Sequence, residues 1–473
     1  MIEFGTAGIR GPVPETVDHR VAIAVGQTLP AVLEHPSDEV VVGRDARTTG
    51  PSLMAGLIAG LTTAGATCRK TDPVPTPVLA HASKGRLGVM VTASHNPPGD
   101  NGIKVFRDGS EIRDSEEERI EQAIDTPVDE VTWRDAGSVT SMDPLPEYLN
   151  DLRGYLRRLA QDRALDTAHP LAGLRVAIDG GNGTSIEAIA PLLRSLGATI
   201  STLNANPSGF EPARSSKPTT ASLDAFSHWM ADADDGFDVS FGFDGDGDRV
   251  VVLDGDGSFI HEDTIVAMLA RSFTSYADIE RPVVITTPNA SARIDDAVTE
   301  AGGAVERTKL GGLMEGIDQV NHRGDTNERV VFAAEPWKHL FPGFGEWIDA
   351  IASAGVTSLL VAEAGSLEPL ISPIADPPYV KTAVACPEGR KSTVMEELAS
   401  SLLSAFPDGD LEVTDTGIRI TFERSEWLLI RPSGTEAVIR LYAEGQTTIE
   451  ERLDSATKCV TDLVERTRGT STS

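Results

Sequence analysis

The sequence predicts an α/β fold with three similar mixed α/β domains, followed by a smaller α+β domain. The first observation is a unit that occurs three times: a short apolar strand, a polar loop, an amphipathic helix and a Gly-Ala turn into another strand. The second is a set of linkers, two of them rich in proline, that separate these units. The third is the length of 473 residues, which suggests two to four domains because domains usually hold ~100–200 residues.

Each repeated unit has the pattern of a β-α-β unit. Its two strands must pair in parallel, because a crossover helix connects strands that run in the same direction. Three such units at separate places in one chain indicate three similar domains. The units lie at residues 39–68, 174–200 and 281–305, and their first strands at 40–42, 176–178 and 283–285.

The linkers divide the chain into four parts. Residues 143–146, Asp-Pro-Leu-Pro, precede a helical stretch at 147–165, and residues 253–257 are expected to form a hairpin turn. Four prolines at 369–378 separate a last region of different character. That region is predicted to hold helices at 390–405 and from 448, with strands near 411–422 and 427–429. The predicted domains are 1–146, 147–256, 257–368 and 369–473.

The charge balance excludes some partners. The chain carries 72 acidic against 41 basic residues, a formal net charge of −31. An acidic surface repels phosphodiester backbones, so we expect no nucleic-acid partner. Concentrated salt would screen the strong self-repulsion, and the composition predicts a halophilic protein. An Arg or Lys in a Gly-rich loop of such a chain is therefore informative about phosphate binding.

Targeting and anchoring segments are not apparent in the sequence. No run of ~18 apolar residues predicts a transmembrane helix, and residues 1–5 lack the basic and apolar parts of a secretory signal. Cys68, Cys386 and Cys459 lie far apart without CxxC spacing, which predicts free thiols and no zinc site. We expect a cytoplasmic protein without a membrane partner, as a monomer or a homo-oligomer.

Residues 92–97, Thr-Ala-Ser-His-Asn-Pro, form the first motif that indicates chemistry. The apolar run before them predicts a buried strand, and the Pro-Gly-rich run after them predicts a loop. Ser94 therefore stands where a strand ends, beside His95 and not far from Lys104. A serine presented beside an imidazole and a cation is a candidate phosphoryl carrier, although the same residues also suit an ordinary turn.

Two Gly-containing loops near the ends of the chain are candidates for anion binding, although each also fits a plain turn. Residues 4–11, Phe-Gly-Thr-Ala-Gly-Ile-Arg-Gly, would let the backbone approach an anion, with Arg10 as a charged donor. The loop at 431–436 combines a guanidinium, two hydroxyls and a glycine after a strand. It lacks the Lys-Ser/Thr end of a Walker loop, so nucleotide hydrolysis is not indicated. Its candidate phosphate-binding residues are Arg431, Ser433, Gly434 and Thr435.

Carboxylates alternate with glycines at residues 242–249, Gly-Phe-Asp-Gly-Asp-Gly-Asp-Arg. This spacing can fold three oxygens around one hard cation, and Mg²⁺ suits few protein ligands plus phosphate oxygens. An EF-hand is disfavoured, because Arg249 and Gly255 occupy the places where it needs Gly and Glu. Arg249 suits a stabiliser of phosphoryl oxygens, and an acidic turn is the alternative for the loop. The candidate metal ligands are Asp244, Asp246 and Asp248.

Together these stretches resemble the α-D-phosphohexomutase family, which includes phosphoglucomutases, phosphomannomutases and phosphoglucosamine mutases. The resemblance covers nearly the whole chain and implies four domains around a central cleft, the first three alike. Four motifs stand in the family's order, at 4–11, 92–97, 244–249 and 431–436, and residues 42–45, 75–77 and 101–104 agree as well.

The resemblance implies a role for each matched residue. Ser94 would be the phosphoserine and, with the three aspartates, would hold one Mg²⁺ per chain. Arg10, His95, Lys104 and Arg249 would surround the transferring group, with Lys104 or His95 assisting proton transfer. The C-terminal loop at Arg431 would hold the substrate's other phosphate.

The chain departs from the family in the third domain. The family's sugar loop commonly reads Gly-Glu-x-Ser-Gly-His, and here residues 334–339 read Ala-Glu-Pro-Trp-Lys-His. Trp337 replaces a serine expected to contact sugar hydroxyls, and Lys338 replaces a glycine. Trp337 would either stack on a pyranose face or fill core space. The candidate substrate-binding residues are Thr308, Gly311, Glu335, Trp337 and His339.

We predict an intramolecular phosphotransferase that interconverts hexose 1-phosphate and hexose 6-phosphate through a phosphoserine and a 1,6-bisphosphate, with glucose or mannose favoured. Hexose 1,6-bisphosphate would act as an activator. The alternatives are a phosphoglucosamine mutase, a metal-dependent sugar phosphatase that releases phosphate to water, and a catalytically silent sugar-phosphate-binding protein. Retention of Ser94, Lys104 and all three aspartates argues against the silent protein.

Overall fold

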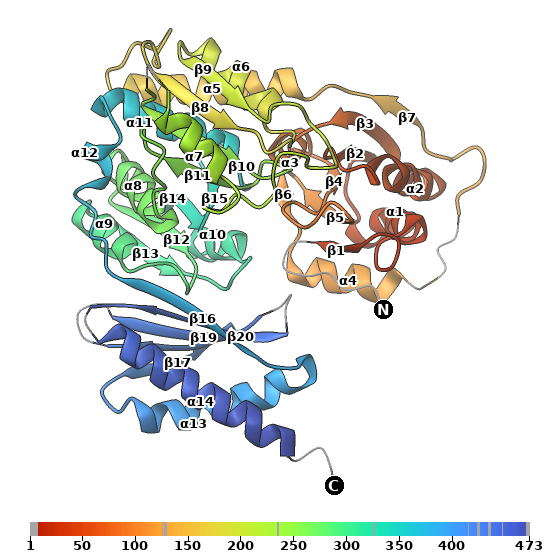
Figure 1. The fold of residues 1–473 in the computed structure, drawn as a ribbon. Helices are drawn as coiled ribbons and strands as arrows, with labels where there is room; N and C mark the ends of the chain where they lie inside the picture. The colour runs from red at the N-terminus through yellow and green to blue at the C-terminus, as the bar shows by residue number, and fades with distance from the viewer. Residues whose placement is uncertain are drawn as a thin grey trace.

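The structure, a computed structural model, describes residues 8–124, 126, 130–233, 236–324, 327–414, 416–422, 426–433, 437–446 and 448–469, with side chains through 467. Within those residues the strands form four sheets (Figure 1). The first three sheets are mixed, because antiparallel strands extend a parallel centre. The fourth is antiparallel. This is the predicted class, with three mixed α/β units and a smaller α+β unit at the C-terminal end.

The first sheet has the strand order β1-β5-β4-β2-β3-β7, and β6 pairs with β5. Strand β4 is buried along its whole length, as its apolar sequence Leu-Gly-Val-Met-Val predicts. It pairs in parallel with β2 and antiparallel with β5. The elements are β1 (Ile9–Pro12), α1 (His19–Leu33), β2 (Glu39–Arg44), α2 (Gly50–Thr63), β3 (Thr67–Pro73), α3 (Thr76–Ala82), β4 (Leu87–Val91), β5 (Asp100–Arg107), β6 (Ser110–Glu111), α4 (Asp114–Ile124) and β7 (Val139–Ser141).

The second sheet has the order β11-β10-β8-β9. Its β8-α6-β9 segment is the second predicted β-α-β unit, and β8 and β9 pair in parallel. Strands β10 and β11 form an antiparallel hairpin whose connecting loop holds the three aspartates. The elements are α5 (Leu145–Asp162), β8 (Arg175–Asp179), α6 (Ile186–Ser195), β9 (Thr199–Leu203), α7 (Asp224–Ala231), β10 (Val239–Phe243) and β11 (Val250–Leu253).

The third sheet has the order β13-β12-β14-β15. Its β12-α9-β13 segment is the third predicted unit, again with a parallel pair of strands. The sugar-loop residues form the turn between β14 and β15, which pair antiparallel. The elements are α8 (Glu262–Ser275), β12 (Arg281–Thr286), α9 (Arg293–Glu300), β13 (Ala304–Arg307), α10 (Leu313–His322), β14 (Glu328–Glu335), β15 (Lys338–Leu340) and α11 (Ala350–Ala364).

The fourth sheet has the order β16-β20-β19-β18-β17 and carries two long helices. The stretch predicted as strand near 411–422 is a hairpin of two strands, in which Thr414 pairs with Gly417. Strands β16 and β20 complete the sheet, and the sequence analysis did not assign them. The elements are α12 (Glu368–Ile371), β16 (Tyr379–Ala385), the short 3₁₀ helix η1 (Glu388–Arg390), α13 (Lys391–Ala405), β17 (Asp410–Thr414), β18 (Gly417–Thr421), β19 (Trp427–Pro432), β20 (Val438–Glu444) and α14 (Ile449–Gly469).

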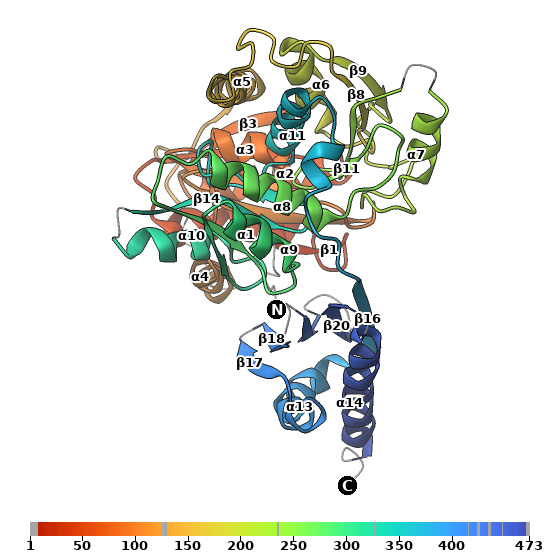
Figure 2. The same ribbon diagram turned by 90° about the vertical axis from the view of Figure 1, so that its left-hand side faces the viewer.

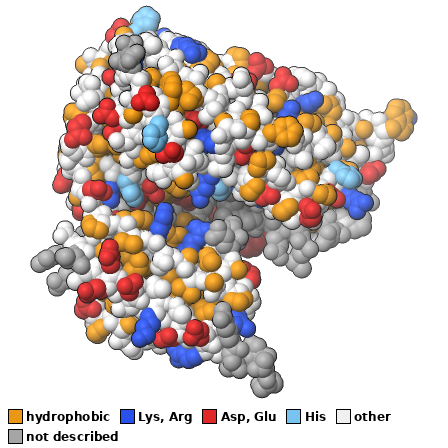
Figure 3. Space-filling model, viewed as in Figure 1, with side chains coloured by type: hydrophobic (Ala, Val, Ile, Leu, Met, Phe, Trp, Pro, Cys, Tyr) orange, Lys and Arg blue, Asp and Glu red, His pale blue; other side chains and the backbone are white. Residues whose placement is uncertain are grey.

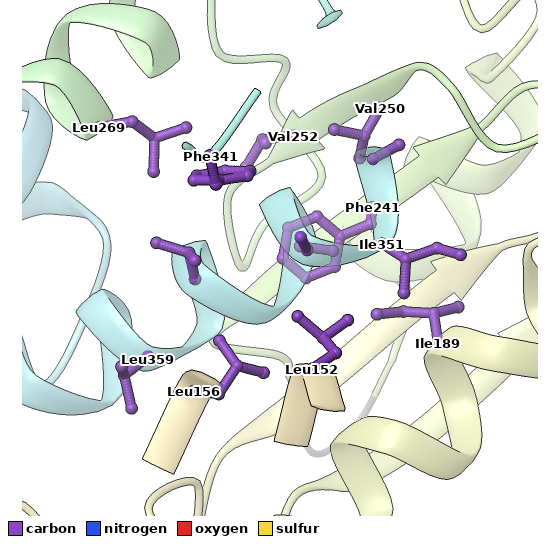
Figure 4. Packing of buried hydrophobic residues seen from close by; sticks show 14 of the residues in the cluster. Leu152, Leu156, Ile189, Phe241, Val250, Val252, Leu269, Phe341, Ile351 and Leu359 are labelled. Carbon is purple, nitrogen blue, oxygen red and sulfur yellow. The ribbon is translucent and has the colours of Figure 1, made fainter. Parts of the chain in front are cut away.

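One apolar core joins the first three sheets. It contains Val41 of β2, Val176 of β8 and Val284 of β12. Helix α11 passes through this core, with Ile351 facing Phe241 of β10 and Ile189 of α6 (Figure 4). A helix that is apolar on all sides, as α11 is, is expected to be buried.

The C-terminal sheet has a core of its own, formed with α13 and α14. Figure 2 shows this part below the other three, and the chain enters it through β16. The first three sheets therefore share a common packed interior, whereas the fourth is joined through polar and aromatic contacts such as the bond from the Ala292 amide to the Glu444 carboxylate, 2.9 Å. Among the residues that the structure describes, no helix combines the length and the apolar character needed to cross a bilayer.

Candidate active site

Ser94 lies in the loop that follows β4, and its side chain is completely buried. Its φ of 50° is in the left-handed region, which few residues other than glycine adopt. The Ser94 amide donates to the Thr92 hydroxyl at 2.9 Å. The Ser94 hydroxyl lies 2.8 Å from an oxygen of Asp244 and 3.1 Å from one of Asp248. The predicted carrier serine and the predicted metal loop therefore meet, although 150 residues separate Ser94 from Asp244.

Asp244, Asp246 and Asp248 are buried together in the loop between β10 and β11, with one oxygen of each within 4.8 Å of the others. Asp244 accepts a hydrogen bond from the Gly247 amide at 3.0 Å. Asp246 accepts one from the Thr76 hydroxyl at 2.6 Å, and its other oxygen is buried without a hydrogen-bond partner among the described residues. Three converging carboxylates with an unpartnered buried oxygen fit a divalent cation that prefers oxygen ligands.

The electrostatics of the triad support the same conclusion. Burial raises the pKa of Asp244 above its ordinary value, and the neighbouring Asp248 and Asp246 carboxylates raise it further. Burial would also raise the pKa of Asp248, but Lys104 and Arg249 outweigh it and lower that pKa. Like charges at such short range cannot all remain ionised without a compensating positive charge. The triad could therefore hold a metal ion.

Lys104 of β5 supplies positive charge directly beside the triad. Its ammonium lies 2.9 Å from Asp248 and 3.3 Å from Glu111, and its side chain is only 2% exposed. Burial would lower the pKa of Lys104, but the carboxylates of Asp248 and Glu111 outweigh that effect and raise it. Lys104 is therefore a firmly held cation. Arg249 follows the triad and lies 3.9 Å from Asp248.

Arg10 reaches the same place from β1. Strands β1 and β5 are antiparallel neighbours in which Arg10 faces Gly102, and this pairing puts Arg10 close to Lys104. Two nitrogens of its guanidinium, Nε and Nη2, are buried without a hydrogen-bond partner among the described residues. Burial lowers the pKa of Arg10, and the nearby Asp248 and Asp246 carboxylates partly oppose this. Buried donors without an acceptor are costly, so this guanidinium is arranged to receive an anion.

His95 lies at the edge of the cleft next to Ser94. Burial, and then the positive charge of Arg249, lowers the pKa of His95 to about 2. The imidazole is therefore neutral near pH 7, and its Nδ1 is buried without a hydrogen-bond partner in the described part of the chain. The neutral His95 ring can donate or accept a hydrogen bond with a bound group, but it does not add a charge to the site.

A cleft of about 660 Å³ extends from His95 to the C-terminal sheet. Its lining comes from all four parts of the chain, and among the described lining residues cations outnumber acids despite the net charge of −31. Figure 3 shows this hollow between the C-terminal part and the rest, with Lys and Arg side chains at its rim. A cationic cleft in an acidic protein favours anionic ligands. The charged lining residues are Lys217, Arg249, Glu262, Glu335, Lys338, Lys381, Arg431 and Arg440.

The predicted sugar loop forms a tight turn that projects into this cleft. Trp337 has a φ of 69°, an unusual value for a bulky residue, and its indole lines the cleft and packs on the apolar cluster of Leu223 and Phe226. The ammonium of Lys217 lies 5.8 Å from the centre of the indole ring. The Glu335 carboxylate accepts a hydrogen bond from the Gly311 amide at 2.6 Å. The turn therefore combines one aromatic surface with charged groups.

Two of the predicted substrate-binding residues do not line the cleft. His339 is buried beneath the turn, where Nδ1 contacts the Ser353 hydroxyl at 2.5 Å, and burial lowers the pKa of His339 to about 3. Thr308 donates to the Gly312 carbonyl at 3.0 Å. Gly311, Glu335 and Trp337 do line the cleft.

The predicted C-terminal phosphate loop begins where β19 ends. Arg431 donates to the Tyr442 hydroxyl at 3.2 Å, and its Nε is buried without a partner among the described residues. Ser433 also lines the cleft, and its amide donates to the Val438 carbonyl at 3.0 Å. Gly434 and Thr435 lie outside the described residues, as do residues 4–7 of the N-terminal motif.

Several residues at the site escaped the sequence analysis. Lys217 and Arg440 line the cleft, but each is an isolated basic residue without a motif around it. Thr76, which contacts Asp246, belongs to a Pro-Thr-Pro stretch that was noted only as agreeing with the family. Arg47 contacts the Ser94 loop, and the spacing Asp45-Ala46-Arg47 after a buried strand was the available signal.

Comparisons with known proteins agree with this geometry. Models of the phosphoglucomutase/phosphomannomutase family match residues 1–130 as α/β/α domain I, 153–257 as α/β/α domain II and 382–454 as the C-terminal domain. A phosphopentomutase from Thermococcus kodakarensis is 34% identical over 468 residues, which cover 98% of both chains. A probable phosphoglucosamine mutase from Methanothermobacter thermautotrophicus is 32% identical, over 98% of this chain and 97% of its own.

Solved structures show the same fold. The structure of a phosphoglucomutase/phosphomannomutase family protein from Burkholderia thailandensis superposes with a TM-score of 0.83 over 98% of both chains, at 23% identity. The matched relatives are phosphomutases, which move a phosphoryl group within a substrate. The chain therefore belongs to the phosphoglucomutase/phosphomannomutase family, the α-D-phosphohexomutases, and is an enzyme of the intramolecular phosphotransferase class.

Proposed function

We propose that the enzyme moves a phosphoryl group between the 1-oxygen and the terminal oxygen of a sugar, with Ser94 as the phosphoryl carrier. The observation that carries the proposal is the contact of the Ser94 hydroxyl with Asp244 and Asp248 beside a cationic cleft. A plain structural serine has no need of two buried carboxylates and a buried lysine beside it.

The proposed reaction has two transfers of opposite direction. In the first, the bond from phosphorus to Ser94 Oγ breaks, a bond from phosphorus to a sugar oxygen forms, and the sugar hydroxyl loses its proton. The resulting bisphosphate then reorients within the cleft, so that its other phosphoryl group faces Ser94. In the second, its other phosphoryl group moves to Ser94 Oγ, and the sugar oxygen that is released takes up a proton. Lys104 and His95 are the candidates for moving these protons.

Arg10, Lys104 and Arg249 would stabilise the negative charge on the transferring oxygens. Asp244, Asp246 and Asp248, together with phospho-Ser94, would hold Mg²⁺, which when bound would neutralise further phosphoryl charge.

A bisphosphate intermediate requires a second anion site, and the C-terminal loop is the candidate. Arg431 carries a buried, unpartnered Nε at the far side of the cleft from His95. A guanidinium binds a phosphate in a bidentate manner, which fixes the orientation of the sugar as well as adding affinity. We therefore assign the non-transferring phosphate to Arg431, Ser433, Gly434 and Thr435, and hexose 1,6-bisphosphate would activate the enzyme by phosphorylating Ser94.

For the sugar, glucose or mannose phosphate is the first candidate, on the basis of the family resemblance. A pentose phosphate is the second candidate, and two observations favour it. The indole of Trp337 occupies part of the cleft where the family commonly has a serine, and the relative from Thermococcus kodakarensis is a phosphopentomutase. Glucosamine phosphate is the third, because several archaeal relatives are named probable phosphoglucosamine mutases.

Product analysis with a panel of sugar 1-phosphates tests the proposal. Glucose, mannose, glucosamine, N-acetylglucosamine and ribose 1-phosphates would be supplied separately with Mg²⁺, concentrated KCl and a trace of the matching bisphosphate. We expect one preferred substrate to give its 6-phosphate, or the 5-phosphate for ribose, and Ser94→Ala to abolish the conversion. Release of inorganic phosphate alone would identify a phosphatase instead. Binding of the panel without any conversion would identify a silent sugar-phosphate-binding protein.

The same panel tests the role of Trp337. Replacing Trp337 with Ser restores the residue that the family commonly has and removes the indole from the cleft. If the indole selects a smaller sugar, the ratio of kcat/KM for glucose over ribose 1-phosphate should rise by roughly 10-fold or more, as expected for 1–3 kcal/mol of discrimination in a pocket. An unchanged ratio would show that Trp337 fills core space without setting specificity.

A further inference from the structure

One buried guanidinium organises the loop that carries Ser94. Arg47 follows β2, and its side chain is 4% exposed. Its five N–H groups have five acceptors, so the donor capacity of the side chain is completely used. The acceptors are a carboxylate oxygen of Asp45 at 3.2 Å for Nε, the carbonyls of Pro97 and Asp100 at 2.6 and 2.9 Å for Nη1, and the carbonyls of Ser94 and Asn96 at 2.9 and 2.6 Å for Nη2.

The loop also has two backbone hydrogen bonds of its own, from the Asn96 amide to the Ala93 carbonyl and from the Asp100 amide to the Pro97 carbonyl, both at 3.0 Å. It runs from Thr92 to Gly99 between two strands, so its carbonyls lack the partners that a sheet would supply. Ser94 is in the left-handed region, where a non-glycine residue is disfavoured unless its surroundings fix it. The Asp45 carboxylate that accepts from Arg47 also accepts from the Thr92 hydroxyl at 2.7 Å. Arg47 and Asp45 therefore fix both ends of the turn at Ser94.

The same guanidinium connects the loop to the second domain. Glu211 lies 3.8 Å from Arg47 Nη2 and accepts a hydrogen bond from the Ser216 amide at 2.9 Å. The Ser216 hydroxyl donates to the Ser94 carbonyl at 3.1 Å. A Cβ atom on Gly209 would lie 2.7 Å from the Cα of Arg47, so the two backbones are in close contact. Residues 209–216 thus dock on Arg47, and their domain also carries the three aspartates.

We propose that Arg47 is a positioning residue for phosphoryl transfer, one that sets the Ser94 hydroxyl against the aspartate triad; this rests on the proposed role of Ser94 as carrier. Arg47 is absent from the described lining of the cleft, so it acts through Ser94 and not on the substrate. A displacement of about 1 Å at a reacting atom can reduce a rate by ~100-fold. Loss of Arg47 should therefore lower kcat while leaving the distal phosphate contacts, and with them KM, largely intact.

A general effect on folding is the competing explanation, and the chain offers a matched control. Arg163 is also a buried arginine, 7% exposed, and donates to the Ser272 hydroxyl at 2.8 Å and the Leu159 carbonyl at 3.2 Å. It also pairs with Glu363 at 3.1 Å. It belongs to the α5–α8 contact and does not line the cleft in the described structure. Arg163→Lys therefore reports the cost of disturbing a buried guanidinium away from Ser94.

The experiment compares wild type, Arg47→Lys, Glu211→Gln and Arg163→Lys in the full chain. The measurements are kcat, KM, Tm and the fraction of Ser94 phosphorylated over time after mixing with the sugar bisphosphate, by intact mass. We expect Arg47→Lys to lower kcat and the rate of Ser94 phosphorylation by ~100-fold with KM within about threefold of wild type. Glu211→Gln should lower kcat by a smaller factor, and Arg163→Lys should lower Tm without changing kcat.

Three results would overturn the inference: kcat for Arg47→Lys within threefold of wild type, an equal loss of kcat in Arg163→Lys, or a loss confined to KM. If Arg47→Lys does not fold, Glu211→Gln is the deciding variant, and an unchanged kcat in that variant would overturn the inference. A wild-type enzyme that is active without any phosphate on Ser94 would instead contradict the proposed function itself. The two failures are therefore distinguishable.

Discussion

At the scale of single residues, the site is built from buried side chains that would be unfavourable without a bound anion and cation. Ser94 adopts a left-handed backbone conformation and directs its hydroxyl to two carboxylates. Arg10 and Arg431 each keep a buried donor without a partner in the described chain, and Asp246 keeps a buried acceptor. Each buried polar group without a partner needs an explanation, and a bound anion and cation would supply the partners of these groups.

Replacement of Arg431 tests the distal phosphate site. Arg431→Ala should raise KM by roughly 10- to 150-fold with little change in kcat, because it breaks a charge-assisted contact worth ~1.5–3 kcal/mol. Steady-state kinetics with the preferred sugar 1-phosphate would measure this. Arg466→Ala, on the exposed face of α14, is the control. A KM equal to that of the control would indicate that the loop at Arg431 is a plain turn.

Asp263 should make the free energy of unfolding depend on pH, and this effect does not involve the aspartate triad or Ser94. It is completely buried at the start of α8, and burial, followed by the Glu262 carboxylate, raises the pKa of Asp263 to about 8. The folded chain therefore keeps a proton that the unfolded chain releases near its ordinary pKa of 3.8. The stability contributed by this group is complete below that ordinary pKa and is lost as the pH rises through about 8.

Asp263→Asn is neutral at every pH, so it should remove this dependence. Relative to wild type, its free energy of unfolding should increase as the pH rises from about 4 to about 8, by up to about 1.4 kcal/mol per pH unit. Chemical denaturation across this range would measure the difference, with the exposed Glu300→Gln as control. A difference that stays constant with pH would refute the assignment.

At the scale of elements, the candidate site consists of loops that follow strands. The serine loop follows β4, the aspartate loop joins β10 to β11, the predicted sugar turn joins β14 to β15, and the predicted phosphate loop follows β19. Rigid strands fix where each loop begins, while the loop sequence is free to carry chemistry. The third sheet has the same β-α-β pattern as the first two. Its loop at the cleft, between β14 and β15, carries Trp337 and Lys338 in place of residues that the family commonly has.

The aspartate loop should make stability dependent on magnesium. Addition of Mg²⁺ should raise the Tm of wild type, because a ligand that binds only the folded chain stabilises it, by ~2.7 kcal/mol at 100 times its Kd. Asp246→Asn removes the carboxylate with the unpartnered oxygen and should lose most of that rise. Asp254→Asn, in the turn after β11, is the control and should keep it. An equal rise in Asp246→Asn would argue against this residue as a ligand.

Much of this arrangement could be predicted from the sequence, because it rests on local patterns. The apolar run at β4, the spacing of the three aspartates and the Gly-Ala turns of the β-α-β units are all read within a few residues. Arg47, Lys217 and Thr76 could not be found in this way, since their importance comes from contacts with residues far away in the chain. Strand β16 could not be found for a similar reason, because it pairs with β20, which lies far along the chain. Strand β20 also pairs with its neighbour β19, so its apolar residues were a local signal that was available in the sequence.

At the scale of the whole molecule, a strongly acidic chain surrounds a cationic cleft. We propose the domain boundaries 1–146, 147–256, 257–368 and 369–473, so that each domain contributes one of the loops around that cleft. The first three domains share a core, and the fourth has its own. The predicted phosphate loop is therefore carried by the domain that does not share the common core of the other three.

The net charge of −31 predicts that salt stabilises the fold. Raising KCl from about 0.1 M to 1 M shortens the Debye length from ≈ 10 Å to ≈ 3 Å and screens the repulsion between surface carboxylates. Tm should rise over this range, which calorimetry would measure. A Tm that does not rise in KCl would contradict the prediction of a halophilic protein.

The fate of a labelled phosphoryl group tests most directly whether Ser94 is the phosphoryl carrier. The enzyme would be incubated with ³²P-labelled sugar bisphosphate, separated from it, digested to locate the label, and mixed with unlabelled sugar 1-phosphate in a single turnover. We predict that the label is on Ser94, is absent from Ser94→Ala, and passes to the sugar, first in the bisphosphate and then in the 6-phosphate product, or the 5-phosphate for a pentose. Label on another residue, an active enzyme that never becomes labelled, or transfer of the label only to water would contradict this prediction.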